Sequence, residues 1–197
     1  MEIDPTTLDG RTAYKTLIGC VVPRPIGWAS TVDAEGRPNL APFSFFGAVT
    51  TSPMTLMLSV GRRAGVRKDT AANLLATGEA VLHIADRDLA AAMVATSADL
   101  PPEGDEFEHA GLTKAASSAV RPPRVAEAKV AMECVLREHM EVGNGPVDLF
   151  LLEVLRLHVD EAVCIDGIPD AGKLRAVGRL GGAGYADTAD VFEIPRT

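Results

Sequence analysis

The stretch IGWASTVDAEGRPNLAPFSFFGAVT, residues 26–50, contains the pattern that decides the fold. Its first part, residues 26–31, has the composition of a β-strand. A turn signal follows at residues 33–36, where Gly36 supplies the positive φ that tight turns require. Residues 39–50 return as the hairpin partner. Pro42 within them cannot donate to a ladder, so it predicts a strand at the edge of a sheet or a bulge.

The rest of the chain extends this hairpin into a mainly β pattern. Further segments with strand signals are residues 54–60, 79–85, 130–136 and 149–159. Short helices are expected between residue 70 and Gly78, and over residues 87–98 with Asp86 as the cap. We expect loops over residues 100–125 and in the glycine-rich tail from residue 178. Hairpin-connected strands with few helices favour a closed antiparallel barrel with helical additions over alternating βαβ units.

The composition excludes several classes of protein. The 197 residues are 47% hydrophobic and carry a net charge of -8, which argues against binding to nucleic acid or anionic membranes. No apolar run approaches the roughly 20 residues of a membrane helix, and the acidic start predicts no signal peptide. Three scattered cysteines predict a reducing, cytoplasmic location without disulfides, with Cys134 in the core. The histidines lack ligand spacing, so no metal site is expected.

The segment GRRAGVRKDT, residues 61–70, concentrates positive charge in an acidic chain. It leads into a helix that Asp69 or Thr70 can cap. The free N–H groups of a helix start, with cations beside them, form a site for a phosphate. The alternative is a solvated turn whose arginines pair with some of the 27 acidic residues. The segment alone does not separate these two interpretations.

The segment NLAPFS, residues 39–44, is unusual for a strand because its proline leaves neighbouring backbone groups unpaired. Such groups can hold the edge of a planar heteroaromatic ring. An edge strand protected against aggregation is equally consistent with the pattern. Ser30 and Thr31 end the preceding strand, and their hydroxyl groups either face a ligand or bind their own backbone.

The tail segment GRLGGAGY, residues 178–185, is similar to a dinucleotide fingerprint but has the wrong context. It does not connect a strand to a helix, and no acidic residue follows about 20 positions later. We therefore expect a flexible loop, in which Tyr185 either packs or covers a ligand or a dimer partner. The chain also lacks a Ser-His-Asp order and a nucleophile elbow. Any redox or transfer chemistry would have to come from a cofactor.

Three motifs in order give the chain a family resemblance. RPIGWAST at residues 24–31, NLAPFSFF at 39–46 and Lys68-Asp69-Thr70 resemble the flavin reductase-like, FMN-binding split-barrel family. The resemblance continues through Asn73 and later strands and covers roughly residues 20–160. It implies a mainly β Greek-key split β-barrel with short helices. We expect one domain over residues 1–197, with residues 161–197 as a C-terminal extension.

The resemblance also implies a cofactor and partners. FMN, or alternatively FAD, would bind at the interface of a homodimer and receive electrons from NAD(P)H. A partner oxygenase or another acceptor would take the electrons. No catalytic side chain is implied. By the resemblance, the flavin is held by Ser30, Thr31, Asn39, Leu40, Ala41, Pro42, Phe43, Ser44, Ser59, Arg62, Lys68, Asp69 and Thr70, of which Ser59, Arg62, Lys68 and Thr70 would hold the phosphate.

Two departures from the family pattern leave details open. The basic segment is rich in arginine, so the arginine that meets the phosphate is undecided among Arg62, Arg63 and Arg67. The segment GNGPVD, residues 143–148, stands where many relatives carry a histidine, which leaves contacts to substrate or nicotinamide open. We expect an NAD(P)H:flavin oxidoreductase. The alternative is a flavin-binding electron carrier, reduced by a protein partner, with no nicotinamide site. The retained motifs argue against a barrel that has lost FMN.

Overall fold

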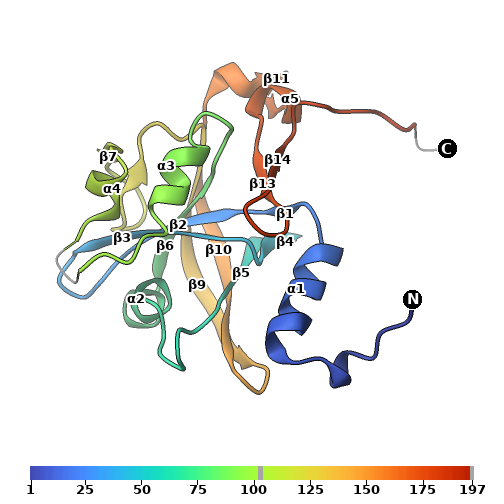
Figure 1. The fold of residues 1–197 in the computed structure, drawn as a ribbon. Helices are drawn as coiled ribbons and strands as arrows, with labels where there is room; N and C mark the ends of the chain where they lie inside the picture. The colour runs from blue at the N-terminus through green and yellow to red at the C-terminus, as the bar shows by residue number, and fades with distance from the viewer. Residues whose placement is uncertain (102–103, 196–197) are drawn as a thin grey trace.

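The computed structural model describes residues 1–101 and 104–195, and one antiparallel sheet dominates it (Figure 1). Its seven strands follow the spatial order β3-β2-β6-β9-β10-β5-β4. Their bounds are β2 Gly27–Val32, β3 Pro38–Phe43, β4 Phe46–Thr51, β5 Met54–Val60, β6 Glu79–Ile84, β9 Val130–Val142 and β10 Val147–Val159. The prediction of a mainly β fold with short helices is confirmed.

The two edges of the sheet are consecutive in the chain. The segment expected as one strand over residues 39–50 forms two strands, β3 and β4, which are separated at Ser44 and Phe45. The backbone N–H of Ser59 donates to the carbonyl of Phe45 at 2.8 Å, which ties this connection to β5. The sheet therefore curls enough for a two-residue connection to join its two edge strands. Strand β3 with Pro42 lies at an edge, as predicted.

Apolar side chains cover both faces of β2. Ala29 belongs to a core inside the curled sheet, with Leu58, Leu82 and Phe150. Trp28 belongs to a second core outside the sheet, with Leu40, Met93, Phe107 and Val177. Every residue of β2 is consequently buried. Successive strand side chains point to opposite faces, so a strand covered on both sides is apolar or small throughout.

Short elements surround the sheet. The helices are η1 Pro5–Thr7, α1 Gly10–Cys20, α2 Asp69–Thr77, α3 Ala90–Ala95, α4 Glu106–His109, η2 Glu161–Val163 and α5 Ala171–Leu174. The small strands are β1 Arg24–Pro25, β7 Lys114–Ala115, β8 Arg124–Val125, β11 Cys164–Ile165, β12 Ile168–Pro169, β13 Val177–Arg179 and β14 Tyr185–Asp187. None of the helices in the described residues is long and apolar enough to span a membrane.

Two helix predictions need correction. Helix α1, which begins after the cap residue Asp9, was not expected. Helix α3 is shorter than the predicted range 87–98. The Asp86 carboxylate accepts hydrogen bonds from the backbone N–H groups of Asp88 and Leu89, so it stabilises a turn before the helix. Short side chains of this kind bind nearby N–H groups in turns as readily as in caps.

The expected flexible loop at the C-terminus is an ordered hairpin. Strand β13 pairs with both β1 and β14, and the Arg179 guanidinium lies 4.5 Å from the centre of the Tyr185 ring. The buried guanidinium of Arg24 in β1 donates to the carbonyls of Ile18, Val21 and Leu180. These contacts join the end of α1 and the C-terminal hairpin to the sheet. Tyr185 packs against the second core.

Candidate functional site

Two cavities lie beside the end of the edge strand β3. The first has a volume of about 590 Å³, and its walls include the rings of Tyr14, Pro42, Phe43, Phe45 and Pro146. It is completed by Ser44, Ser59, Gly61, Arg62, Gly65, Lys68, Gly145 and Val147. Flat apolar walls with a few hydroxyl and cationic groups are typical of sites for planar ligands.

The second cavity is larger and more polar. Its volume is about 900 Å³, and it extends from β3 and the start of α2 to the end of α3 and to α4. Asn39, Asp69, Thr70, Asn73 and Glu106 are among its lining residues. The two cavities share Pro42, Phe43 and Lys68. They therefore meet at Lys68.

The structure divides the predicted site residues into four groups. Ser44, Ser59 and Arg62 line the first cavity. Asn39, Ala41, Asp69 and Thr70 line the second, and Pro42, Phe43 and Lys68 line both. Ser30, Thr31 and Leu40 line neither, because their side chains are fully buried.

The buried hydroxyl of Thr31 holds two side chains that line the second cavity. It accepts hydrogen bonds from the side-chain amides of Asn39 at 3.2 Å and Asn73 at 3.1 Å. The Asn39 amide also donates to the Thr70 hydroxyl at 2.9 Å. This network fixes the first turn of α2 against β3. On the opposite face of β2, the Ser30 hydroxyl is the one buried side-chain polar atom in the described residues that has no hydrogen-bond partner.

The start of α2 differs from the prediction. Lys68 occupies the N-cap position without a side-chain cap, and the helix begins at Asp69. Neither Asp69 nor Thr70 therefore caps the helix. Thr70 is buried and bound to Asn39, which leaves its hydroxyl unable to turn back to the helix start. The predicted end is confirmed, since Gly78 closes the helix in the left-handed conformation with φ 71°.

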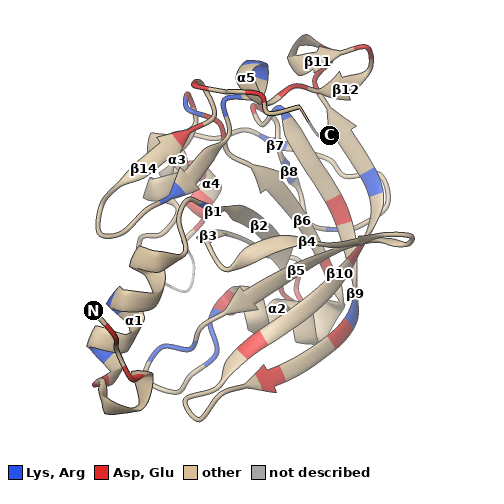
Figure 2. Ribbon diagram, turned by 90° about the vertical axis from the view of Figure 1, so that its right-hand side faces the viewer, with Lys and Arg blue, Asp and Glu red and all other residues tan. Residues whose placement is uncertain are grey.

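The arginines of the basic segment are bound to carboxylates. Arg62 contacts Asp148 through Nε at 3.0 Å and Glu141 through Nη2 at 2.8 Å. Arg67 contacts the same two carboxylates, and the exposed Arg63 pairs with Asp99 at 2.5 Å. Figure 2 shows the basic loop beside the acidic end of the β9–β10 hairpin. The hydrogen bonds that Arg62 donates to Asp148 and Glu141 raise its pKa above the ordinary value.

Lys68 has a different environment. No ion pair involves it in the part of the chain that the structure describes. Its ammonium nitrogen lies 5.6 Å from the centre of the Phe43 ring. A cation over an aromatic face is attracted to it without being neutralised. Lys68 thus brings a positive charge to the junction of the two cavities, at the positive end of the α2 dipole.

Glu106 places a carboxyl group on the wall of the second cavity. Its Oε2 accepts a hydrogen bond from the backbone N–H of Leu40 at 3.2 Å. This N–H points away from β2, on the free side of the edge strand. Burial raises the pKa of the half-buried Glu106 carboxyl above its ordinary value. An internal carboxylate therefore already satisfies one of the edge groups that the sequence predicted to be free.

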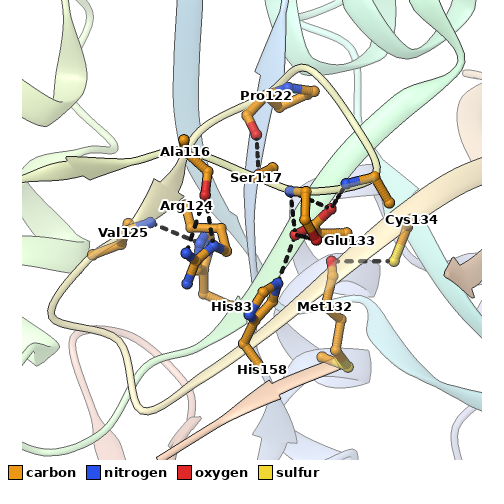
Figure 3. A network of polar contacts seen from close by, with 12 residues as sticks. His83, Ala116, Ser117, Pro122, Arg124, Val125, Met132, Glu133, Cys134 and His158 are labelled. Atoms are coloured by element: carbon orange, nitrogen blue, oxygen red, sulfur yellow. Dashed lines mark hydrogen bonds and ion pairs between the residues drawn. The ribbon is translucent and has the colours of Figure 1, made fainter. Parts of the chain in front are cut away.

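A second polar network lies away from the cavities (Figure 3). Glu133, buried in β9, accepts hydrogen bonds from the backbone of Ser118 and Ala119 and contacts His158 Nε2 at 2.6 Å. Burial opposes ionisation of Glu133, but these hydrogen bonds outweigh it and lower its pKa to about 2. None of these residues lines either cavity. The network attaches the segment around residue 118 to the sheet.

His83 anchors the neighbouring part of that segment. Its Nδ1 lies 2.9 Å from the Trp28 carbonyl, and its Nε2 accepts from the backbone N–H of Val125 at 2.9 Å. These partners require a neutral ring protonated at Nδ1. Complete burial lowers the pKa of His83 to about 4. Burial likewise raises the pKa of the Cys134 thiol to about 12, in agreement with its predicted place in the core.

Comparison with known proteins now identifies the family. Residues 18–166 match the model of the flavin reductase like domain. This chain belongs to the flavin reductase-like family. The structure of this flavin reductase-like protein is similar to nitrilotriacetate monooxygenase component B from Bacillus cereus, with a TM-score of 0.94, 38% identity and 98% of each chain covered. The predicted split-barrel fold is thereby confirmed.

Two further relatives support the assignment. The structure of 2-nitrobenzoate 2-nitroreductase NbaA from Pseudomonas fluorescens matches with a TM-score of 0.90 and 26% identity, over 100% of this chain and 96% of that chain. An uncharacterised protein from Aquifex aeolicus is 41% identical over 94% of each chain. The similarity extends over nearly the full length of each of these chains.

Several lining residues were not predicted from the sequence. Tyr14 lies on the unexpected helix α1, and Glu106 lies on a helix within a predicted loop. Gly145, Pro146 and Val147 belong to the segment GNGPVD, which was interpreted from the sequence only as a departure from the family pattern. The signal in the sequence for this part of the first cavity's wall is the Gly-Asn-Gly-Pro turn beside a long apolar strand.

Proposed function

We propose that this protein is an FMN-dependent oxidoreductase that uses NADH or NADPH to reduce flavin. The observation that carries the proposal is the junction at Phe43 and Lys68. A cavity walled by rings meets a cation that lacks an ion pair in the described residues, at the start of a helix. These features correspond to the two ends of FMN, a planar ring system and a phosphate. Membership of the flavin reductase-like family supports the same chemistry.

The donor set fits each part of this cofactor. Phe43, Phe45 and Pro146 would flank the ring system, and the hydroxyls of Ser44 and Ser59 would reach its polar edge. Lys68 and the backbone N–H groups at the start of α2 would bind the phosphate. In this arrangement Asp69 contributes its backbone, because its carboxylate would repel a phosphate. Thr31 contributes indirectly, by orienting Asn39.

The protein supplies position and electrostatics, and the cofactor supplies the reactive atoms. FMN, when bound, provides hydride and electron transfer, which no protein side chain can provide. Lys68 would offset the phosphate charge, and the ring-lined walls would exclude water from the reacting face. No side chain needs to act as an acid or base in hydride transfer, so we propose no catalytic residue.

We further propose a homodimer in which a second copy covers the first cavity. Ser59 shares the outer face of the sheet with the exposed Met57, and Met140 lies across from Leu149 on that face. Val142, also exposed, pairs with Val147 on the cavity wall. This exposed apolar surface is continuous with the first cavity. Large apolar patches beside a ligand site are typical of interfaces.

The acceptor of the electrons is proposed from similarity. The Bacillus cereus relative is component B of a monooxygenase. We propose that electrons pass from this protein to a partner oxygenase or to another acceptor of similar potential. The acidic surface expected from a net charge of -8 would favour a partner with a basic docking face.

The test is the visible absorption spectrum of the purified protein, recorded before and after anaerobic addition of NADH and then NADPH. We expect a flavin spectrum, directly or after titration with FMN, that bleaches with one of the nucleotides. A flavin spectrum that neither nucleotide bleaches would indicate a flavin-binding electron carrier instead of a reductase. Failure to bind FMN or FAD at all would refute the proposed function.

A further inference from the structure

Asp148 lies at the beginning of β10, in the segment GNGPVD, and is completely buried. Its Oδ2 lies 3.0 Å from Arg62 Nε, and its Oδ1 lies 3.1 Å from Arg62 Nη2. The same Oδ1 lies 3.0 Å from Arg67 Nε and 2.9 Å from His139 Nε2. One carboxylate thus contacts three side chains. Burial disfavours its ionised form, but these hydrogen bonds outweigh burial and hold the pKa of Asp148 below its ordinary value.

The surrounding charges are balanced without Lys68. Glu141 adds a second carboxylate that contacts both Arg62 and Arg67. Two guanidinium groups therefore face two carboxylates, and His139 stacks on Phe150 at a centroid distance of 5.0 Å. A buried carboxylate that loses its partners is strongly destabilising, so such a cluster has one favoured arrangement. The two arginines line the cavities, but their charges are paired within this cluster.

The cluster holds both ends of a tight turn. Arg63 and Val66 exchange backbone hydrogen bonds at 2.9 and 2.8 Å, and the turn between them contains Ala64 and Gly65 with positive φ. Arg62 and Arg67 stand immediately before and after these paired residues. Because both bind Asp148, the carboxylate closes the base of the loop.

This loop forms the wall between the two cavities. Gly61, Arg62 and Gly65 line the first cavity. Arg63, Ala64, Val66 and Arg67 line the second, and Lys68 follows directly at the junction. The position of the loop therefore sets the position of Lys68, while the Thr31 network holds the first turn of α2 that follows it.

We propose that Asp148 is a positioning residue for phosphate recognition, which holds the 62–67 loop so that Lys68 and the start of α2 face the ligand. The proposal rests on the proposed function, since it assumes that the ligand is a flavin with a phosphate group. Asp148 itself lines neither cavity. It acts through the arginines that it binds.

The experiment compares FMN with riboflavin, which has the same ring system but no phosphate. Dissociation constants for both are measured by fluorescence titration of the full-length protein and of Asp148→Asn. We expect Asp148→Asn to weaken FMN binding about tenfold or more while riboflavin affinity changes less than about twofold. General loosening of the fold would weaken both ligands alike. An unchanged ratio of the two affinities would overturn the inference, and so would tighter FMN binding through the released arginines.

Two further variants complete the test. Glu133→Gln alters an equally buried carboxylate in β9 that lines neither cavity. This variant should leave the ratio of the FMN affinity to the riboflavin affinity unchanged. Glu141→Gln removes the half-exposed partner of both arginines and should lower the ratio in the same direction as Asp148→Asn, by less. If Asp148→Asn does not fold, an unchanged ratio in Glu141→Gln overturns the inference. Failure of the unaltered protein to bind either flavin would refute the proposed function, and this inference with it.

Discussion

The ammonium nitrogen of Lys68 lies 5.6 Å from the centre of the Phe43 ring, where the two cavities meet. The three arginines of the same basic segment are paired with Asp148, Glu141 or Asp99. Within the described residues, Lys68 is the cation of this segment that no carboxylate neutralises. A site that binds an anion needs such an uncompensated charge, and the fold supplies it at a helix start.

Replacement of Lys68 by Ala should weaken FMN binding. A hydrogen bond to a charged group contributes about 1.5–3 kcal/mol, which corresponds to a loss of about 10- to 150-fold in affinity. Riboflavin affinity should change little, because riboflavin has no phosphate. Calorimetric titration with both ligands provides the measurement. Lys173→Ala, which removes the same charge from α5, is the control and should bind FMN normally. Equal loss of both ligands in Lys68→Ala would contradict the assignment.

Glu106→Gln should tighten FMN binding. The amide oxygen can still accept the hydrogen bond from the Leu40 N–H, while a negative charge is removed from the cavity that would hold the phosphate. Coulomb repulsion across such a cavity is worth about 1 kcal/mol, or roughly a fivefold change in affinity. Titration at pH 8 measures the effect. Glu108→Gln on the same helix, which lines neither cavity, should have no effect. Weaker binding in Glu106→Gln would show that the carboxylate contacts the ligand directly.

Met140→Glu should convert the proposed homodimer into monomers. Met140 is 41% exposed on the outer face of β9, beside the first cavity, and a carboxylate there would be repelled and desolvated in an interface. Light scattering after size-exclusion chromatography measures the mass in solution. Val94→Glu changes a side chain of similar exposure, 42%, on α3 and should leave the mass unchanged. A dimer that persists in Met140→Glu would place the interface elsewhere.

His83 should make the stability of the protein fall with acidity. Its pKa is about 4 in the folded protein, against an ordinary value of 6.5. Between these values the unfolded chain binds a proton that the folded chain excludes. The contribution of the neutral His83 ring to the free energy of unfolding is therefore complete above pH 6.5 and is lost as the pH falls toward 4. The expected loss in the free energy of unfolding is about 3 kcal/mol by pH 4.5.

Urea unfolding of the wild type and of His83→Gln, at pH 7.5 and pH 4.5, tests this prediction. Glutamine can replace both hydrogen bonds of the ring but cannot be protonated, so the variant should lose less stability over this interval. His109→Gln, a change at an exposed histidine, is the control. Between pH 7.5 and pH 4.5 it should lose as much stability as the wild type. An equal loss of stability in His83→Gln and in the wild type would mean that other groups cause the acid sensitivity.

Local signals predicted much of the sheet. The hairpin around residues 33–36 was found because its turn and apolar pattern are contiguous in sequence, and β5 was predicted to the residue at Met54–Val60. The break between β3 and β4 was missed because it depends on Phe45 binding Ser59 across the curled sheet. Helix α1 was missed for a similar reason, because the buried Arg24 holds its last carbonyls.

Most of the residues expected in the site line one of the two cavities, and their binding of flavin stays a prediction. Which cation is available could not be predicted, because Asp148 lies 86 positions after Arg62 and 81 after Arg67. Only the fold brings these groups together. Pairing across such a distance leaves no periodic trace in the sequence.

The C-terminal hairpin has a consequence for how the protein is made. Strand β1 pairs only with β13 among the described strands, and Arg24 in β1 reaches the carbonyl of Leu180. Val177 completes the second core, although it lies beyond the part of the chain that matches the family model. During synthesis, β1 must wait for this described neighbour until the segment around residue 177 has left the ribosome. Until then the partly finished barrel exposes an apolar flank, which is the stage at which a chaperone would protect it from aggregation.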